Sequence, residues 1–292
     1  MDPLTRRWRV PALDERAPKS TRDPDVPIHV ALGPKVLDGG LATSLRQRGV
    51  PPGTPITTWL DEHPSAVEHA QRSFVDAGAI GLLTATFRSL PHLDSEWERH
   101  LDVAAEIATR ASHGRAWLWG SLGPGGRRGE SWRDADASTR RAWTQSWTRA
   151  ADRLGPSVHG LVLETFIDPD ECLAALRAVK EARPDQAVVT SLVPTDSGRL
   201  HNGQSPRHAL EALRLAGADI LGFNCGTTPE GVTLAIRACR GVGPLWAKPA
   251  GGRNLRQRVV ELADDCDWIG GCCGVTYKDI VVLARSVAET HA

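Results

Sequence analysis

The feature that most constrains the fold of this chain is a regular alternation of short apolar runs with longer amphipathic segments, which starts at residue 35. The apolar runs predict eight strands, at residues 35–37, 81–86, 116–121, 160–164, 187–192, 220–224, 245–248 and 268–270. The amphipathic segments predict eight helices, which begin near Ser65, Asp94, Ser138, Asp168, Ser205, Pro229, Leu255 and Thr276. Eight strand–helix units in about 250 residues predict an α/β protein with a single (β/α)8 TIM-type barrel.

A doubly wound open sheet is the alternative fold. Such a sheet usually carries a glycine-rich dinucleotide fingerprint after its first strand, and Asp38-Gly39-Gly40 lacks that spacing. Residues 1–30 are rich in Pro, Arg and Asp without a sustained period, so we expect an irregular N-terminal arm there. Residues 31–292 are then expected to form the barrel.

Composition excludes several classes of function. The chain has 292 residues with 35 basic and 35 acidic side chains, so no net charge draws it toward nucleic acid or an anionic membrane. No apolar run is long enough to span a bilayer, and no apolar stretch follows the N-terminus as in a secretory signal. We therefore expect a cytoplasmic protein with small-molecule partners.

Three of the six cysteines follow predicted strands. Cys225 directly follows the sixth predicted strand, and Cys272 and Cys273 follow the eighth. Active sites of such barrels lie at the carboxyl ends of the strands, where the sixth and eighth strands are next-nearest neighbours. Three converging thiolates with no obvious fourth ligand suit a catalytic Zn2+ with one open position. That position would suit a substrate thiol, which predicts alkyl transfer to sulfur.

The competing interpretation of a cysteine at a strand end is a small buried apolar residue. We apply it to Cys172, Cys239 and Cys266. For the three clustered cysteines, spacing alone leaves both interpretations open.

Seven motifs lie in order along the chain, most of them where a predicted strand ends. They are Asp38-Gly39-Gly40-Leu41-Ala42-Thr43, Ala77-Gly78-Ala79, Thr84-x-Thr86-Phe87, Gly120-Ser121-Leu122-Gly123-Pro124, Glu164-Thr165, Gly222-Phe223-Asn224-Cys225 and Gly270-Gly271-Cys272-Cys273-Gly274. From about residue 35 to residue 285, the chain resembles the zinc-dependent homocysteine S-methyltransferases. That family includes betaine– and S-methylmethionine–homocysteine methyltransferases and the homocysteine domain of cobalamin-dependent methionine synthase.

The resemblance implies that Cys225, Cys272 and Cys273 hold the zinc ion. It also implies that Asp38 and Glu164 contact the amino group of the amino-acid thiol, as carboxylates suit an ammonium ion.

The further substrate-binding residues expected at the barrel mouth are Thr86, Ser121 and Asn224. Backbone N–H groups around residues 121–123 could hold the substrate carboxylate, with a plain turn as the alternative.

Three departures from the family pattern stand near these residues. Ala85 replaces an asparagine that is frequent between the two threonines, and Ala250 replaces an asparagine that often follows the strand-seven proline. The connection from Pro249 to Cys272 is shorter than is usual in the family. We infer that the thiol chemistry is kept, whereas the donor and the identity of the thiol stay open.

The resemblance implies zinc-dependent methyl transfer from a sulfonium or ammonium donor, such as S-methylmethionine, to homocysteine. The only catalytic group expected is the zinc-activated thiolate, so none of the ten histidines, expected mostly at the surface, receives a role. A cationic donor would favour an aromatic wall, for which Trp59 or Trp119 could serve, although packing is the competing role for each.

Three alternatives remain. Residues 197–204 resemble the corresponding stretch of cobalamin-dependent methionine synthase, so the barrel could accept a methyl group from a separate corrinoid protein. The enzyme could methylate a different thiol. The chain could also be a non-catalytic zinc-binding scaffold, which Ala85 and Ala250 motivate and the retained cysteines and carboxylates oppose. The sequence does not determine the oligomeric state.

Overall fold

The computed structural model describes residues 34–290 except 52, 128, 227 and 253–254, so the expected arm of residues 1–30 lies outside the described residues. Eight strands form one parallel sheet in the order β1-β8-β7-β6-β5-β4-β3-β2. They are β1 (Lys35–Val36), β2 (Gly81–Leu83), β3 (Trp117–Leu122), β4 (Gly160–Phe166), β5 (Ala187–Leu192), β6 (Ile220–Cys225), β7 (Leu245–Pro249) and β8 (Trp268–Ile269).

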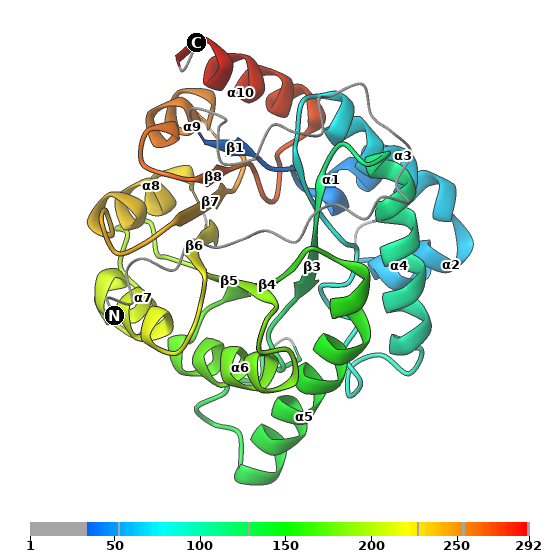
Figure 1. Ribbon diagram of the computed structural model, residues 1–292, viewed down its shortest axis with the longest axis vertical. Coiled ribbons are helices and arrows are strands. Elements are labelled where there is room, and N and C mark those ends of the chain that lie inside the picture. Colours follow the sequence, from blue (N-terminus) through cyan, green and yellow to red (C-terminus); the bar gives the residue numbers. More distant parts are fainter. Residues whose placement is uncertain (1–33, 52, 128, 227, 253–254, 291–292) are drawn as a thin grey trace.

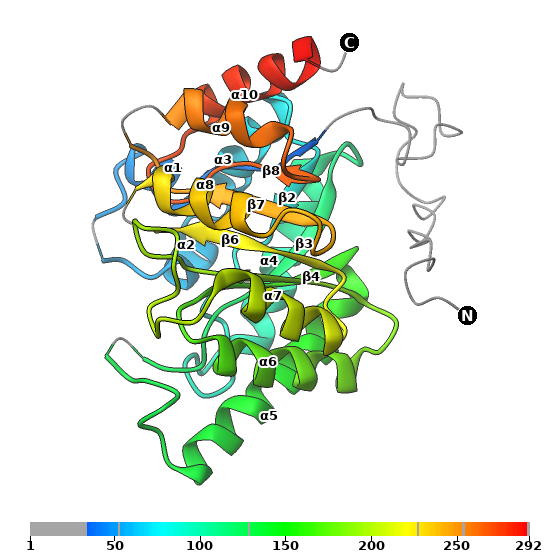
Figure 2. The same cartoon turned by 90° about the vertical axis from the view of Figure 1, so that its left-hand side faces the viewer.

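The sheet closes into a barrel between β1 and β2, the two strands at the ends of this order. Leu37 forms a parallel bridge with Gly81. The Ile80 N–H donates to the Val36 carbonyl at 2.8 Å, and the Asp38 N–H donates to the Gly81 carbonyl at 3.0 Å. Figure 1 shows the resulting ring of strands inside a ring of helices, and Figure 2 shows it from the side. The predicted (β/α)8 barrel is confirmed, and the open-sheet alternative is wrong.

The described part of the chain contains ten α-helices. They are α1 (Leu41–Arg46), α2 (Ile56–Glu62), α3 (Pro64–Asp76), α4 (Trp97–Ser112), α5 (Ala137–Leu154), α6 (Pro169–Ala182), α7 (Pro206–Leu215), α8 (Pro229–Ala238), α9 (Leu255–Ala263) and α10 (Tyr277–Thr290). Helices α3 to α10 confirm the eight predicted helices. Asp168 caps α6 by accepting a hydrogen bond from the Asp170 N–H, which explains why that start was readable.

Helices α1 and α2 were not expected from the sequence. Neither has a side-chain cap or an acidic residue in its first turn. They bury Leu45 and Leu60 in one cluster with Val67 of α3. Helices this short are stabilised mainly by tertiary packing, so local sequence signals are weak.

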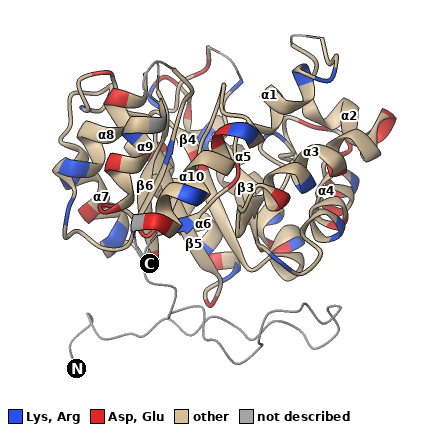
Figure 3. Ribbon diagram, turned by 90° about the horizontal axis from the view of Figure 1, so that it is seen from above, with Lys and Arg blue, Asp and Glu red and all other residues tan. Residues whose placement is uncertain are grey.

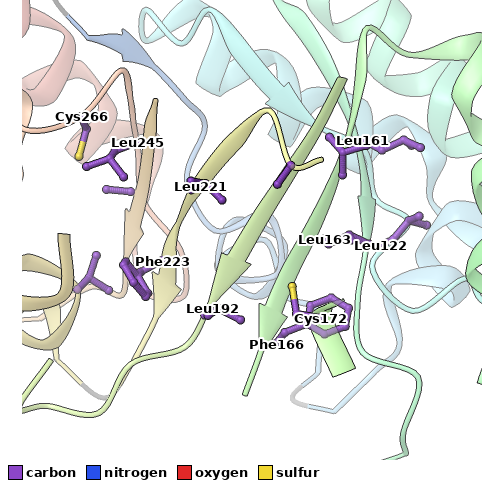
Figure 4. Packing of buried hydrophobic residues seen from close by; sticks show 14 of the residues in the cluster. Leu122, Leu161, Leu163, Phe166, Cys172, Leu192, Leu221, Phe223, Leu245 and Cys266 are labelled. Atoms are coloured by element: carbon purple, nitrogen blue, oxygen red, sulfur yellow. The ribbon is translucent and has the colours of Figure 1, made fainter. Parts of the chain in front are cut away.

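The outer faces of the strands pack against the helices in the main apolar core (Figure 4). Cys172 lies beside Phe166 in this layer, and Cys266 lies beside Leu245. Cys239 is fully buried in the same core. The prediction that these three cysteines are packing residues is confirmed.

The base of the barrel is filled by Trp117, Trp119, Trp246 and Trp268. The ring of Trp119 packs edge-on against Trp246 and Trp268, with centroid distances of 5.5 and 5.4 Å. Gly160 makes room for it, because a Cβ there would lie 2.5 Å from the indole. Trp119 is fully buried, so the interpretation of this residue as a wall for a methyl donor is wrong. Trp59 packs against the apolar cluster of α1–α4, and its ring centroid lies 4.7 Å from that of His63.

Charges of both signs are interspersed over the helices (Figure 3). No helix in the described ranges combines the length and apolar character that crossing a membrane requires.

Candidate active site

The three predicted metal-ligating cysteines converge at the mouth of the barrel. Cys225 ends β6, and Cys272 and Cys273 lie in the turn after β8. Their sulfur atoms lie within 4.8 Å of one another, and the Sγ atoms of Cys225 and Cys273 are 3.7 Å apart. The turn is tight: a Cβ on Gly271 would lie 2.2 Å from the Val275 side chain, so only glycine fits before the cysteine pair.

This donor set fits a metal ion that favours sulfur. Hydrogen bonds from Cys225 and Cys272 lower the pKa of Cys273, whereas the pKa values of Cys225 and Cys272 are raised, so the three sulfurs on their own favour a single thiolate, the form that ligates metals. Cys273 is exposed, whereas Cys225 and Cys272 are partly buried, so the cluster is open on one side. Three sulfur ligands with an open side match a catalytic Zn2+ site better than a closed structural one.

Asn224 joins the cysteine cluster to β4 and β5. Its Oδ1 accepts hydrogen bonds from the Thr165 N–H at 2.9 Å and the Ser191 hydroxyl at 2.7 Å. Its Nδ2 donates to the Thr165 hydroxyl at 2.8 Å and lies 3.8 Å from the Cys272 sulfur. Asn224 is fully buried, so its amide holds the ends of neighbouring strands in position.

Glu164 precedes Thr165, the residue that Asn224 holds by hydrogen bonds. It lies in an irregularity of β4, where the register with β5 shifts between Leu163 and Phe166. Thr165 takes a left-handed φ of 66° there. Bulges commonly re-aim a side chain next to a site. The Glu164 carboxylate accepts a hydrogen bond from the Ser121 hydroxyl, and burial raises its pKa to about 7.

Ser121 and Thr86 form one buried network with Thr84. The Thr86 hydroxyl donates to the Ser121 carbonyl at 2.6 Å and lies 2.6 Å from the Thr84 hydroxyl. The Ser121 N–H donates to Thr84 Oγ1 at 3.1 Å, and the Gly123 N–H donates to the Phe87 carbonyl at 3.0 Å. Both N–H groups are therefore committed within the chain, which favours the plain turn over a carboxylate-binding backbone at residues 121–123.

Asp38 is paired inside the protein. One carboxylate oxygen binds the ammonium of Lys248, and the other accepts a hydrogen bond from the Leu83 N–H at 2.9 Å. Both side chains are buried, with exposed fractions of 4% for Asp38 and 3% for Lys248. Burial alone would lower the pKa of Lys248, but the charges of Asp38 and Glu164 outweigh it and raise that pKa, so Lys248 is protonated.

Sequence reasoning assigned Lys248 no role. The signal was present, since Lys248 is the one charged residue in the otherwise apolar β7 and stands next to its carboxyl end. In the register with β6 it lies opposite Asn224, which places it at the depth of the site.

Two of the three departures from the family pattern, Ala85 and Ala250, lie just outside the site. Ala85 is buried in the apolar cluster of α1–α4. Ala250 is buried, and its N–H donates to the Cys225 carbonyl at 3.2 Å. These small residues therefore support the elements that carry the site.

A second polar layer fixes the loop after β3. Arg88 donates to the Gly126 carbonyl, and the Trp147 indole donates to the Gly123 carbonyl at 3.0 Å. Glu171 accepts from the Gly125 N–H at 2.9 Å, and a ring nitrogen of His92 lies 2.6 Å from the Gly125 carbonyl. His92 thus has a structural role that the sequence did not indicate.

The profile of a family described as homocysteine S-methyltransferase matches residues 35–287. The chain is 29% identical over 196 residues to S-methylmethionine–homocysteine S-methyltransferase BHMT2 of Rattus norvegicus, which is 66% of this chain and 52% of that protein. It is 24% identical over 269 residues to methionine synthase of Mycobacterium tuberculosis, covering 78% of this chain and 22% of that protein. The chain therefore spans about half the length of the BHMT2 relative.

The structure is similar to the metallated form of the homocysteine methyltransferase MmuM from Escherichia coli. The TM-score is 0.76 at 25% sequence identity, and the match covers 87% of this chain and 96% of the other.

Proposed function

This chain belongs to the homocysteine S-methyltransferase family, and we propose that it transfers a methyl group to the thiol of homocysteine, giving methionine. S-methylmethionine or another sulfonium or ammonium compound would be the donor. The observation that carries the proposal is the convergence of three cysteine sulfurs at the carboxyl ends of the strands, at the same mouth as the carboxylates of Asp38 and Glu164. The names of BHMT2 and MmuM support the same reaction.

Cys225, Cys272 and Cys273 would hold Zn2+, because three thiolates with an open side suit that ion. When bound there, zinc would lower the pKa of the acceptor thiol, so that the nucleophilic thiolate is present at neutral pH. Asn224 would keep the ligands in place through its contacts with Thr165 and Cys272.

The carboxylates would orient the acceptor. Asp38 and Glu164 supply the negative charge that suits the ammonium group of an amino-acid thiol, and Ser121 orients Glu164 through its hydroxyl. Thr86 would not contact the acceptor, since it is fully buried. It would instead keep Ser121 in position by donating a hydrogen bond to the Ser121 carbonyl. This orientation would align the sulfur with the donor methyl group.

The reaction would be a single displacement. The thiolate sulfur attacks the methyl carbon, a new S–CH3 bond forms, and the bond to the donor atom breaks with its electron pair left on the donor. The acceptor loses its thiol proton to solvent. No general base is needed, in keeping with the absence of a role for histidine in the expected mechanism.

The proposal is tested by incubating zinc-loaded protein with L-homocysteine and one donor at a time, and detecting methionine by mass spectrometry. The donors are S-methylmethionine, S-adenosylmethionine, betaine and methyltetrahydrofolate. Methionine from one donor, lost after metal chelation and restored by zinc, is the expected result. No methionine from any donor at stoichiometric zinc would reject homocysteine methylation by free donors and favour another thiol.

A second candidate is a methyl-acceptor barrel that works with a separate corrinoid protein. The observation that favours it is the match to methionine synthase over 269 residues. Residues 197–204, which resemble that enzyme, follow β5 in a loop closed by an antiparallel bridge between Pro194 and Leu200. Methylation by a free donor without added protein would argue against this candidate.

A further inference from the structure

Lys248 changes the charge of the proposed acceptor site. The side chains of Asp38 and Glu164 carry two negative charges when ionised, and Lys248 supplies one positive charge among them. One carboxylate is therefore neutralised within the protein before any ligand arrives. The geometry says which one, because the Lys248 ammonium is hydrogen-bonded to Asp38 and not to Glu164.

The two carboxylates also differ in their remaining hydrogen-bonding capacity. Both oxygens of Asp38 have partners, in Lys248 and in the Leu83 N–H. Glu164 has one hydrogen bond, from Ser121, and among the described residues its second oxygen has none. An incoming ammonium ion would therefore find its open acceptor at Glu164.

Lys248 itself has donors to spare. A lysine ammonium carries three N–H groups, and the structure gives that of Lys248 a single acceptor among the described residues, Asp38. The N–H groups of Ser121 and Gly123, the other candidates for an anionic ligand, are already used within the protein. The α-carboxylate of an amino acid has a matching partner in the Lys248 ammonium.

We propose that Lys248 is a specificity-determining residue that binds the carboxylate of the acceptor, while Glu164 alone binds its ammonium group and Asp38 positions Lys248. The preferred acceptor is then a zwitterionic amino-acid thiol recognised at both charged groups. This inference rests on the proposed function for the presence of a thiol substrate, and it reassigns Asp38 from ligand to positioning residue.

The test compares three thiols in equilibrium calorimetric titrations of zinc-loaded protein, without a methyl donor. They are L-homocysteine, aminopropanethiol (homocysteine without its carboxylate) and mercaptobutanoate (homocysteine without its ammonium group). We expect Lys248→Met to weaken homocysteine and mercaptobutanoate binding by about 10- to 100-fold, the effect of a lost charged hydrogen bond, and to leave aminopropanethiol within about 3-fold. Glu164→Gln should instead weaken homocysteine and aminopropanethiol and spare mercaptobutanoate.

Lys248→Met leaves Asp38 as an unpaired buried carboxylate, which threatens folding. The double variant Asp38→Asn with Lys248→Met removes both charges and should show the same pattern, and Lys248→Arg should recover part of the carboxylate preference. Equal weakening of all three thiols, or unchanged homocysteine binding, would overturn the inference.

Asp38→Asn alone decides between positioning and direct contact. It should reproduce a milder form of the Lys248→Met pattern. Loss of homocysteine and aminopropanethiol binding with mercaptobutanoate spared would mean that Asp38 binds the ammonium, against the inference. Methionine formation is measured separately, so thiol binding of the expected pattern without turnover rejects only the proposed function.

Discussion

The base of the barrel is filled with tryptophan rings, whereas the mouth is lined with sulfur, carboxylate and ammonium groups. At the base, the indole N–H groups of Trp119 and Trp246 have no hydrogen-bond partner among the described residues. At the mouth, Asp38 and Asn224 are fully hydrogen-bonded. Apolar burial, which stabilises the base, is non-directional, so unpaired indole N–H groups are tolerated there at a cost in free energy. A binding site such as the mouth needs polar groups held in one geometry, which their hydrogen bonds provide.

The comparison predicts that changes at the mouth affect activity more than stability, and that changes at the base do the opposite.

The largest expected effect is on activity at the mouth. Cys273→Ser removes one of the three sulfurs proposed to hold zinc, so bound zinc should fall well below one equivalent and the proposed methylation should slow by about a thousandfold or more. Zinc content by elemental analysis and the rate of methionine formation check this. Cys172→Ala is the matched control, since it removes a buried cysteine outside the cluster and should retain the metal. Full zinc occupancy in Cys273→Ser would contradict the three-thiolate site.

The second prediction concerns the base. Trp119→Ala should lower the free energy of unfolding by about 3–5 kcal/mol, because it opens a cavity inside the barrel. Denaturant titration measures this loss, and Trp119→Phe should lose less. Zinc content and the Michaelis constant of the folded fraction should stay near wild type. A large change in the Michaelis constant without loss of stability would mean that Trp119 acts at the site.

The third prediction tests Asn224, whose hydrogen bonds hold strand ends together at the mouth. Asn224→Ala leaves the Thr165 N–H and the Ser191 hydroxyl without their acceptor, which should cost about 1–3 kcal/mol of stability. It should also weaken zinc affinity by about 10-fold or more, because the amide holds the Cys272 side of the cluster. A competition titration with a chelator measures the affinity. A purely structural residue would lower stability and leave the zinc affinity unchanged.

The smallest effect is expected in the helix layer. His100 is buried, although the histidines were expected mostly at the surface, and its ring bonds Asp94 at 2.6 Å and Asp61 at 3.0 Å. Burial alone would lower its pKa, but these two carboxylates outweigh burial and raise it above the ordinary value of 6.5. The stabilisation is therefore full below pH 6.5 and is lost as pH rises through the folded-state pKa.

Wild type should exceed His100→Gln in unfolding free energy by about 1 kcal/mol at pH 6, and by less at pH 9. His92 provides the contrast, because burial lowers its pKa and its contribution should instead fall as the solution becomes more acidic. Denaturant titrations at both pH values measure these differences. A difference in unfolding free energy between wild type and His100→Gln that grows with pH would contradict the ion-pair interpretation.

The strands and the three cysteines were readable because their signals are local. An apolar run such as that of β5 predicts a strand wherever it pairs, and a cysteine after a strand end can be placed at the mouth of any parallel barrel. Helices α1 and α2 were not readable, since their stability comes from packing on α3 rather than from caps. The sequence left Trp119 with two possible roles, packing or a wall for the donor, because composition does not show at which end of the barrel a ring lies; the structure confirms packing.

By itself the sequence determined the eight strand–helix units, the barrel and the strand ends that carry sulfur and carboxylate groups. Only the tertiary structure decided how those groups pair. Asp38 and Lys248 are separated by 210 positions and meet because β1 pairs with β8 and β8 pairs with β7, which places the ends of β1 and β7 two strands apart. Local sequence sets the hydrogen-bonding and hydrophobic periodicity of each element, whereas a buried ion pair depends on which distant elements become neighbours.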